Sequence, residues 1–109
     1  MKRFDRPQVG FLCREHIEAI IAAPDVSSWT GRRDRILLAT LYNTGARVSE
    51  LIGARVEDLS LSSSPCLRLQ GKGRKERSIP LWTSTASQLR QWLREQPHMA
   101  TSPLFPNRL

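Results

Sequence analysis

The apolar residues follow a helical period in four segments of this chain, whereas in one stretch past its midpoint they alternate with polar ones. Recurrence every three or four positions is typical of amphipathic helices. In the exceptional stretch, Leu67 and Leu69 alternate with polar residues, as do Ile79 and Leu81, and the glycine-containing segment 71–75 lies between the two runs. This order predicts a β-hairpin. We therefore expect an α+β chain, mainly helical, with about four helices and a small antiparallel hairpin or three-stranded sheet.

Four segments carry the helical spacing, namely residues 12–24, 32–43, 46–53 and 84–96. Ser28 or Thr30 is expected to cap the second helix, and Thr83 the fourth, because short hydroxyl side chains accept hydrogen bonds from free amides at a helix start. Gly45 follows the second helix and suits the left-handed position past a helix C-terminus. The segment 61–65 is expected to be a loop.

The same pattern predicts burial. Val48, Leu51 and Ile52 should form the buried stripe of the third helix. Tyr42 is the only tyrosine of the chain, and its place on the apolar side of the second helix favours a core position over a nucleophilic role. Pro80 has no backbone N–H to donate, so its strand is expected to lie at a sheet edge or to pair on one side only at that point.

The charge balance narrows the class of partner. The chain has 109 residues, enough for one small domain, and 17 Lys and Arg against 10 Asp and Glu give a net charge of +7. This surplus of positive charge favours a polyanionic binding partner, with nucleic acid a better candidate than an anionic membrane. The sequence lacks an apolar run of about 18 residues and a secretory leader, so no membrane partner is expected and the cytoplasm is the expected compartment.

Known motifs for cofactor chemistry are missing from the sequence. Cys13 and Cys66 lie far apart, and His16 and His98 are isolated, so we expect free thiols and no metal site. The sequence contains no Walker loop, no GxGxxG, no HExxH and no GxSxG string. Nucleotide hydrolysis, hydride transfer, and serine or zinc hydrolysis therefore have no support, and no cofactor is expected.

One candidate for anion binding is Arg47, in the string GARVSEL. It falls in the expected first turn of a helix, where the macrodipole disfavours a cation by about 0.3–1 kcal/mol. An arginine is understandable there if a phosphate docks beside it, because free backbone amides and guanidinium then act together. Glu50, one turn later, can pair with Arg47 and fix its orientation. The same spacing also fits an ordinary surface arginine in a local ion pair.

The second candidate is the hairpin, where a single acid accompanies five cations: Arg68, Lys72, Arg74, Lys75 and Arg77. Gly71 and Gly73 allow the backbone to come close to a neighbour. A lysine on such a tip can reach a phosphate as a point charge or a proton donor. The alternative is a solvated basic turn with no ligand.

Residues 41–51 (LYNTGARVSEL) and 71–81 (GKGRKERSIPL) together resemble the tyrosine recombinase or phage integrase family, above all its Xer-type bacterial members. The similarity extends from about Phe11 to the end of the chain. The resemblance implies a flexible N-terminal segment at 1–10 and a single truncated catalytic domain at 11–109. It also implies that the partner is double-stranded DNA.

The resemblance assigns roles to three residues. The family arginine that matches Arg47 contacts the scissile phosphate and stabilises charge in the transition state. The acid that matches Glu50 supports the site, and the lysine that matches Lys72 protonates the leaving 5′ oxygen. The family's tyrosine hydroxyl attacks the phosphodiester and displaces that oxygen, giving a 3′-phosphotyrosyl link that stores the bond energy, so the reaction needs neither ATP nor a metal. The remaining three arginines and one lysine of the hairpin are expected DNA contacts: Arg68, Arg74, Lys75 and Arg77.

Other family features do not match within this chain. The family's His-x-x-Arg motif, the following His or Trp and the tyrosine nucleophile are expected beyond Leu109, and residues 98–101 do not supply them. We therefore expect the chain to bind DNA weakly without cutting it, and to associate with itself or with a missing C-terminal half. A non-enzymatic DNA-binding or regulatory protein derived from a recombinase, and an RNA-binding module, are the alternatives.

Overall fold

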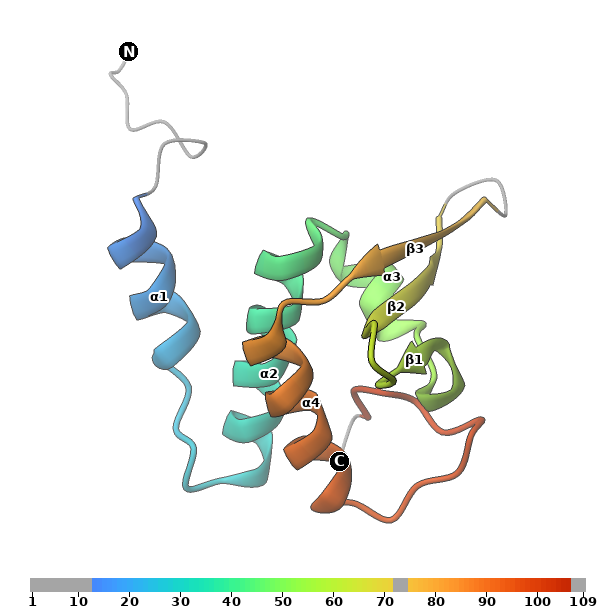
Figure 1. The fold of residues 1–109 in the computed structure, drawn as a ribbon. Coiled ribbons are helices and arrows are strands. Elements are labelled where there is room, and N and C mark those ends of the chain that lie inside the picture. The colour runs from blue at the N-terminus through green and yellow to red at the C-terminus, as the bar shows by residue number, and fades with distance from the viewer. Residues whose placement is uncertain (1–12, 72–74, 107–109) are drawn as a thin grey trace.

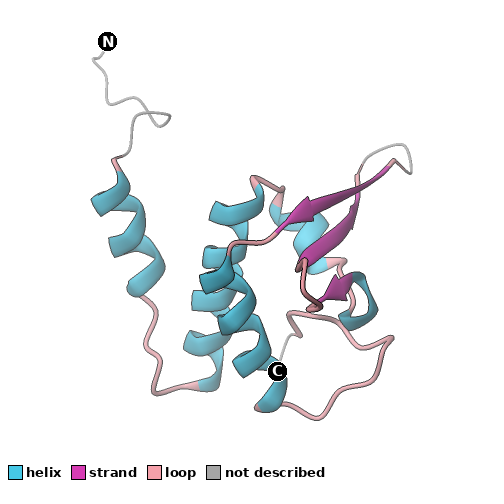
Figure 2. Ribbon diagram, viewed as in Figure 1, coloured by secondary structure: helices cyan, strands magenta, loops and turns pink. Residues whose placement is uncertain are grey.

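The computed structural model describes residues 13–71 and 75–106. Its helices are α1 (Arg14–Ala22), α2 (Trp29–Thr44), α3 (Val48–Ile52) and α4 (Thr83–Arg94), and its strands are β1 (Leu59–Ser60), β2 (Cys66–Gln70) and β3 (Glu76–Pro80), with one 3-10 turn at Val56–Asp58. Four helices and a three-stranded antiparallel sheet confirm the α+β prediction. In Figure 1, α2 and α4 lie side by side between α1 and the sheet, and Figure 2 shows the same layers by element type.

The ends of α2 follow the predicted chemistry. The Ser28 hydroxyl accepts a hydrogen bond from the Gly31 N–H at 2.9 Å, so the helix begins at Trp29. Gly45 ends it in the left-handed conformation (φ 68°), and its N–H donates to the Leu41 carbonyl at 2.8 Å. Of the two proposed caps Ser28 is the one that forms, so the helix begins three residues before the predicted start at residue 32. Gly45 is confirmed as the residue that ends α2, and it sets the point where α2 turns into α3.

The predicted cap of α4 is wrong by one residue. Trp82 occupies the cap position, without a side-chain hydrogen bond to the helix, and Thr83 is already helical. The backbone N–H of Trp82 instead donates to the Asn43 side chain at 2.8 Å, and the Asn43 amide donates to the Pro80 carbonyl at 3.2 Å. The end of α2 therefore fixes the chain where β3 leads into α4.

The strands run in the order β1-β2-β3, so β3 lies at an edge, as Pro80 predicts. Leu67 pairs with Ile79 and Leu69 with Arg77. Directly opposed residues of an antiparallel pair point to the same face, so Arg77 shares the face of the buried Leu69.

The core fills the space between α2, α4 and this face of the sheet. Its fully buried leucines come from four parts of the chain: Leu51, Leu67, Leu69, Leu89 and Leu104. The segment after α4 returns to cover the core, because the Trp92 indole donates to the Leu104 carbonyl at 2.9 Å and the Leu104 N–H donates to Ala54 at 2.9 Å. The residues from α3 to β3 are thus packed against the pair formed by α2 and α4.

Two burial predictions are wrong. In α3 only Leu51 is buried, whereas Val48 and Ile52 are 49% and 57% exposed. A helix of five residues on the rim of the core presents one side chain to it rather than a stripe. Tyr42 is 41% exposed and packs edge-on against the half-exposed Trp82, with ring centroids 5.5 Å apart.

Helix α1 is the least anchored of the described helices. It contacts α2, but none of its residues is buried. Ile17 and Ile21 are half-buried, and Ile20 is 49% exposed. Within the described residues, no helix combines the length and the hydropathy that crossing a bilayer requires.

Candidate functional site

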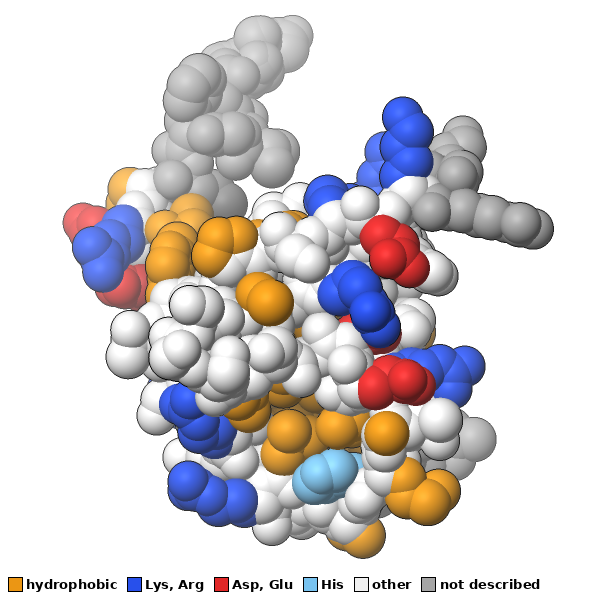
Figure 3. Space-filling view, turned by 45° about the vertical axis from the view of Figure 1, so that its right-hand side comes forward, with side chains coloured by type: hydrophobic (Ala, Val, Ile, Leu, Met, Phe, Trp, Pro, Cys, Tyr) orange, Lys and Arg blue, Asp and Glu red, His pale blue; other side chains and the backbone are white. Residues whose placement is uncertain are grey.

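A groove of about 690 Å³ lies between the start of α3 and the adjoining ends of β2 and β3. Its lining brings together the two strings singled out in the sequence: Gly45, Arg47, Ser49, Glu50, Gln70, Gly71, Lys75, Glu76 and Arg77. Figure 3 shows basic side chains rising beside the hairpin tip, with acidic side chains below them. Arg47, Lys75 and Arg77 therefore face one concavity although they are far apart in sequence.

Two predicted residues, Lys72 and Arg74, lie outside the described residues. The residues on either side of this segment are described, and both line the groove. The Gly71 N–H donates to the Lys75 carbonyl at 2.7 Å. Both residues that flank the segment 72–74 therefore lie at the groove.

Arg47 is the cap residue of α3, just before the helix rather than inside its first turn as predicted, with extended backbone (φ −81°, ψ 151°). Its carbonyl accepts from the Glu50 N–H at 3.0 Å, and its own N–H donates to Glu50 Oε1 at 2.8 Å. Its side chain is exposed, and among the described residues its guanidinium has no hydrogen-bond or ion-pair partner. The backbone of Arg47 is thus fixed while its charge stays available to an anion.

Glu50 holds this corner of the groove together. Its carboxylate receives Arg77 Nη1 at 2.7 Å and Nη2 at 3.3 Å, in addition to the Arg47 N–H, and its side chain is only 9% exposed. The Arg77 hydrogen bond, followed by the Arg47 backbone N–H, lowers the pKa of Glu50 to about 2. The predicted side-chain pair between Glu50 and Arg47 is therefore wrong, since the guanidinium that Glu50 binds belongs to Arg77.

The alternation of the strands contains a signal for this pair that the charge count missed. Counting back by two from the inward-facing Ile79 places Arg77 on the inner face, toward α3. Arg68 opposes Ser78 on the other face. There its guanidinium pairs with Asp58 at 2.9 Å and lines a separate cavity of about 340 Å³. Among the hairpin cations that the structure describes, Arg68 thus lies on the opposite face of the sheet from Arg77 and does not reach the groove.

The pKa of Glu50 gives a prediction for acid stability. A carboxyl group whose pKa falls from 4.5 to about 2 on folding stabilises the native state fully above pH 4.5. That contribution is lost as the pH falls through about 2. We expect Glu50→Gln to flatten the dependence of the unfolding midpoint on pH in this window, measured by urea unfolding. Glu15→Gln, at an exposed site on α1, is the control, and an equal effect of both variants would contradict the prediction.

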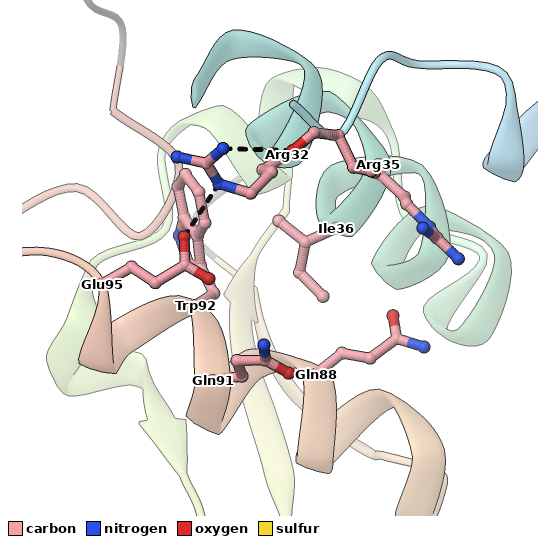
Figure 4. Close-up of a pocket in the computed structure, with 8 residues that line it drawn as sticks. Arg32, Arg35, Ile36, Gln88, Gln91, Trp92 and Glu95 are labelled. Carbon is pink, nitrogen blue, oxygen red and sulfur yellow. Dashed lines mark hydrogen bonds and ion pairs between the residues drawn. The ribbon is translucent and has the colours of Figure 1, made fainter. Parts of the chain in front are cut away.

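A second concavity, of about 270 Å³, lies between α2 and α4 (Figure 4). Ile36 and Trp92 form its buried floor, and Arg32 at its rim donates to Glu95 at 2.9 Å and to the Val26 carbonyl at 3.1 Å. The rise of a helix places it about 18 Å from the α3 end of α2. Arg32 is already neutralised by Glu95, which leaves Arg35 as the cation of this lining that has no partner among the described residues.

The ligand types that metals prefer are scattered in the described part of the chain. Within residues 13–71 and 75–106, no three His, Cys, Asp or Glu side chains are placed to hold an ion. Cys13 and Cys66 are free thiols. The described lining of the groove has five charged side chains, which are those of Arg47, Arg77, Lys75, Glu50 and Glu76.

Comparison with known proteins identifies the arrangement. The model of the phage integrase family matches residues 11–109. A Sinorhizobium fredii protein named as an integrase/recombinase, y4rC, is 45% identical over 106 residues, which are 97% of this chain and 32% of that protein. Tyrosine recombinase XerD of Pseudomonas aeruginosa is 41% identical over 96 residues, 84% of this chain and 32% of that protein. The chain thus spans about a third of the length of the curated relatives it matches.

Solved structures agree with the sequence matches. The XerH site-specific recombinase bound to a palindromic difH substrate superposes with a TM-score of 0.70 at 28% identity, covering 88% of this chain and 29% of that one. The XerA recombinase gives a TM-score of 0.71 at 25% identity, covering 97% and 36%. The two strings, the groove that unites them and these matches lead to one conclusion: the chain belongs to the phage integrase family of tyrosine recombinases.

Proposed function

We propose that this chain supplies the phosphate-binding part of a tyrosine-recombinase catalytic site and binds duplex DNA through the groove at α3. The proposal depends on the surroundings of Arg47. Its guanidinium has no partner among the described residues, its backbone N–H is held by Glu50, and it lines the same groove as Lys75. The similar XerH recombinase forms complexes with difH substrate before and after cleavage. A DNA phosphate is the anion that best fits this charge and this family.

The proposed chemistry divides the work among the cations. Arg47 neutralises charge on the non-bridging phosphate oxygens, which grows in the transition state. Lys72, the residue after Gly71, is assigned the protonation of the leaving 5′ oxygen. Arg74 and Lys75 contact neighbouring phosphates. Cleavage stores the bond energy in a phosphotyrosyl link, so these steps use neither ATP nor a metal.

The single tyrosine of the 109-residue polypeptide is poorly placed to act as the nucleophile. Tyr42 packs against Trp82 and lines a separate groove beside α1, and it is not among the residues that line the groove of Arg47. We therefore propose that this polypeptide binds DNA without forming a covalent adduct. The exposed Val48 and Ile52 also support association with further polypeptide, either a second copy or the rest of a catalytic domain.

Salt dependence tests the proposal. Two to four phosphate contacts predict that log K falls against log salt with a slope of about −1.8 to −3.6, measured by fluorescence anisotropy on duplex DNA. Lys75→Gln should reduce the slope by about 0.9, because one phosphate contact is lost. Arg35→Gln, at an exposed position on α2 outside the groove, is the control and should leave the slope unchanged.

Three outcomes count against the proposal. They are a flat salt dependence, equal effects of Lys75→Gln and Arg35→Gln, and preferred binding of structured RNA in competition with duplex DNA. The first two remove the groove as the binding site, and the third favours an RNA-binding module. Nicking of supercoiled plasmid by the polypeptide would overturn the assignment of Tyr42 as a non-nucleophile.

A further inference from the structure

Arg77 is the groove cation that is already bound to an acid. It donates two hydrogen bonds to Glu50, at 2.7 and 3.3 Å, across 27 residues of sequence. The same carboxylate receives the Arg47 N–H. One carboxylate thus joins β3, through the Arg77 side chain, to the backbone position that carries the exposed guanidinium of Arg47.

Gly71 packs directly against this ion pair. A Cβ atom at Gly71 would lie 3.2 Å from Glu50 Oε2 and 3.3 Å from Arg77 Nη1. A side chain at Gly71 would make tighter than ordinary contacts with both charged groups, so glycine leaves room for the end of β2 beside the pair. The ion pair therefore lies next to Gly71, the residue that immediately precedes Lys72 in the sequence.

We propose that Arg77 is a positioning residue, which acts through Glu50 to hold the backbone of Arg47 beside Gly71 at the end of β2, and that it is not itself a phosphate contact. This inference rests on the proposed function, in which Arg47 and Lys72 act on one phosphate. The sequence assigned Arg77 to DNA contact, so the two roles make different predictions.

The electrostatics of the groove favour positioning. The paired charges of Arg77 and Glu50 largely cancel at a distance, so a phosphate is attracted more strongly by Arg47 and Lys75, whose charges have no partner among the described residues. A planar guanidinium can bind both carboxylate oxygens at once and fixes an orientation that an ammonium cannot. The bidentate geometry thus suits a residue that holds others in place.

The first measurement compares the salt slopes of DNA binding in the charge-matched double variant Glu50→Gln/Arg77→Gln and in the original chain. The double substitution removes one charge of each sign, so the net charge stays at +7. A positioning role predicts weaker binding with an unchanged slope. A phosphate contact predicts a slope smaller by about 0.9, as expected for Lys75→Gln.

The second measurement is independent of DNA. In ¹⁵N-labelled protein, the Arg47 amide reports directly on the Glu50 carboxylate to which it donates. Arg77→Gln should shift this resonance and make it titrate at a higher pH, because the largest cause of the lowered pKa of Glu50 is removed. Arg77→Lys keeps the charge without the bidentate contact and should restore the original resonance only in part.

Arg68→Gln is the matched control for the amide measurement, because it also removes a strand arginine from an ion pair, on the opposite face of the sheet. It should leave the Arg47 amide unchanged. A reduced slope together with an unmoved Arg47 amide would overturn the positioning role. If the original chain shows no salt-dependent binding, the proposed function fails, and the amide measurement alone then decides whether Arg77 positions Arg47.

Discussion

Replacing Arg47 with alanine is expected to slow DNA cleavage by about 10²–10³-fold, the usual cost of removing one donor that stabilises transition-state charge. The experiment uses a chimera in which this chain replaces the matching segment of the Pseudomonas aeruginosa XerD, with which it shares 41% identity. Covalent complex formation is measured on a DNA substrate that the parent recombinase cleaves. The loss should appear in the rate at saturating DNA, because the charge on the phosphate grows during the reaction.

Arg47→Lys separates charge from shape in the same chimera. A lysine keeps the attraction to DNA but cannot offer two parallel donors to the phosphate oxygens. We expect near-original affinity with a rate between those of the arginine and alanine forms. An alanine form that cleaves at the original rate would remove Arg47 from the catalytic site.

Gly31→Ala is expected to destabilise the fold severely, by about 3 kcal/mol or more. A Cβ atom at Gly31 would lie 1.7 Å from the carbonyl oxygen and 2.5 Å from the carbonyl carbon of Asp25. Both atoms belong to the backbone, and the adjacent Ser28 caps α2 through the Gly31 N–H. Relief of the clash would therefore displace the turn before α2 and strain the cap. Urea unfolding of the purified chain measures the loss.

Gly53→Ala is the matched control. Its Cβ would lie 3.5 Å from the nearest atom, the Ser49 carbonyl oxygen, in ordinary van der Waals contact, and its backbone is right-handed (φ −80°). Alanine there should be neutral or stabilising by about 0.5 kcal/mol, because it restricts the unfolded chain. Equal losses for the two variants would show that the close approach at Gly31 is absent in solution.

Local signals predicted the backbone of this protein well. The Ser28 cap, the left-handed Gly45 and the alternating strands each depend on a few neighbouring residues, and each is confirmed. The burial of α3 and of Tyr42 could not be predicted in this way. The burial of these side chains depends on how far the core extends, and the spacing of apolar residues along a helix does not reveal that.

The site shows the same division between local and distant information. The motif strings placed Arg47 and the hairpin together, and the groove confirms that the described parts of both strings meet. The partner of Glu50 was missed because sequence spacing favoured Arg47, three residues away, over Arg77, 27 residues away. Only the pairing of Leu69 with Arg77 brings the second guanidinium to the carboxylate.

The edges of the sheet bear on how copies of this protein can meet. On one side β1 has only two residues, and on the other β3 carries Glu76 and Arg77 and ends at Pro80, which cannot donate a hydrogen bond. Short, charged and proline-containing edges resist the addition of strands from another chain. Polymerisation through a continuous β-ladder is therefore disfavoured, and contacts between copies are left to side-chain surfaces.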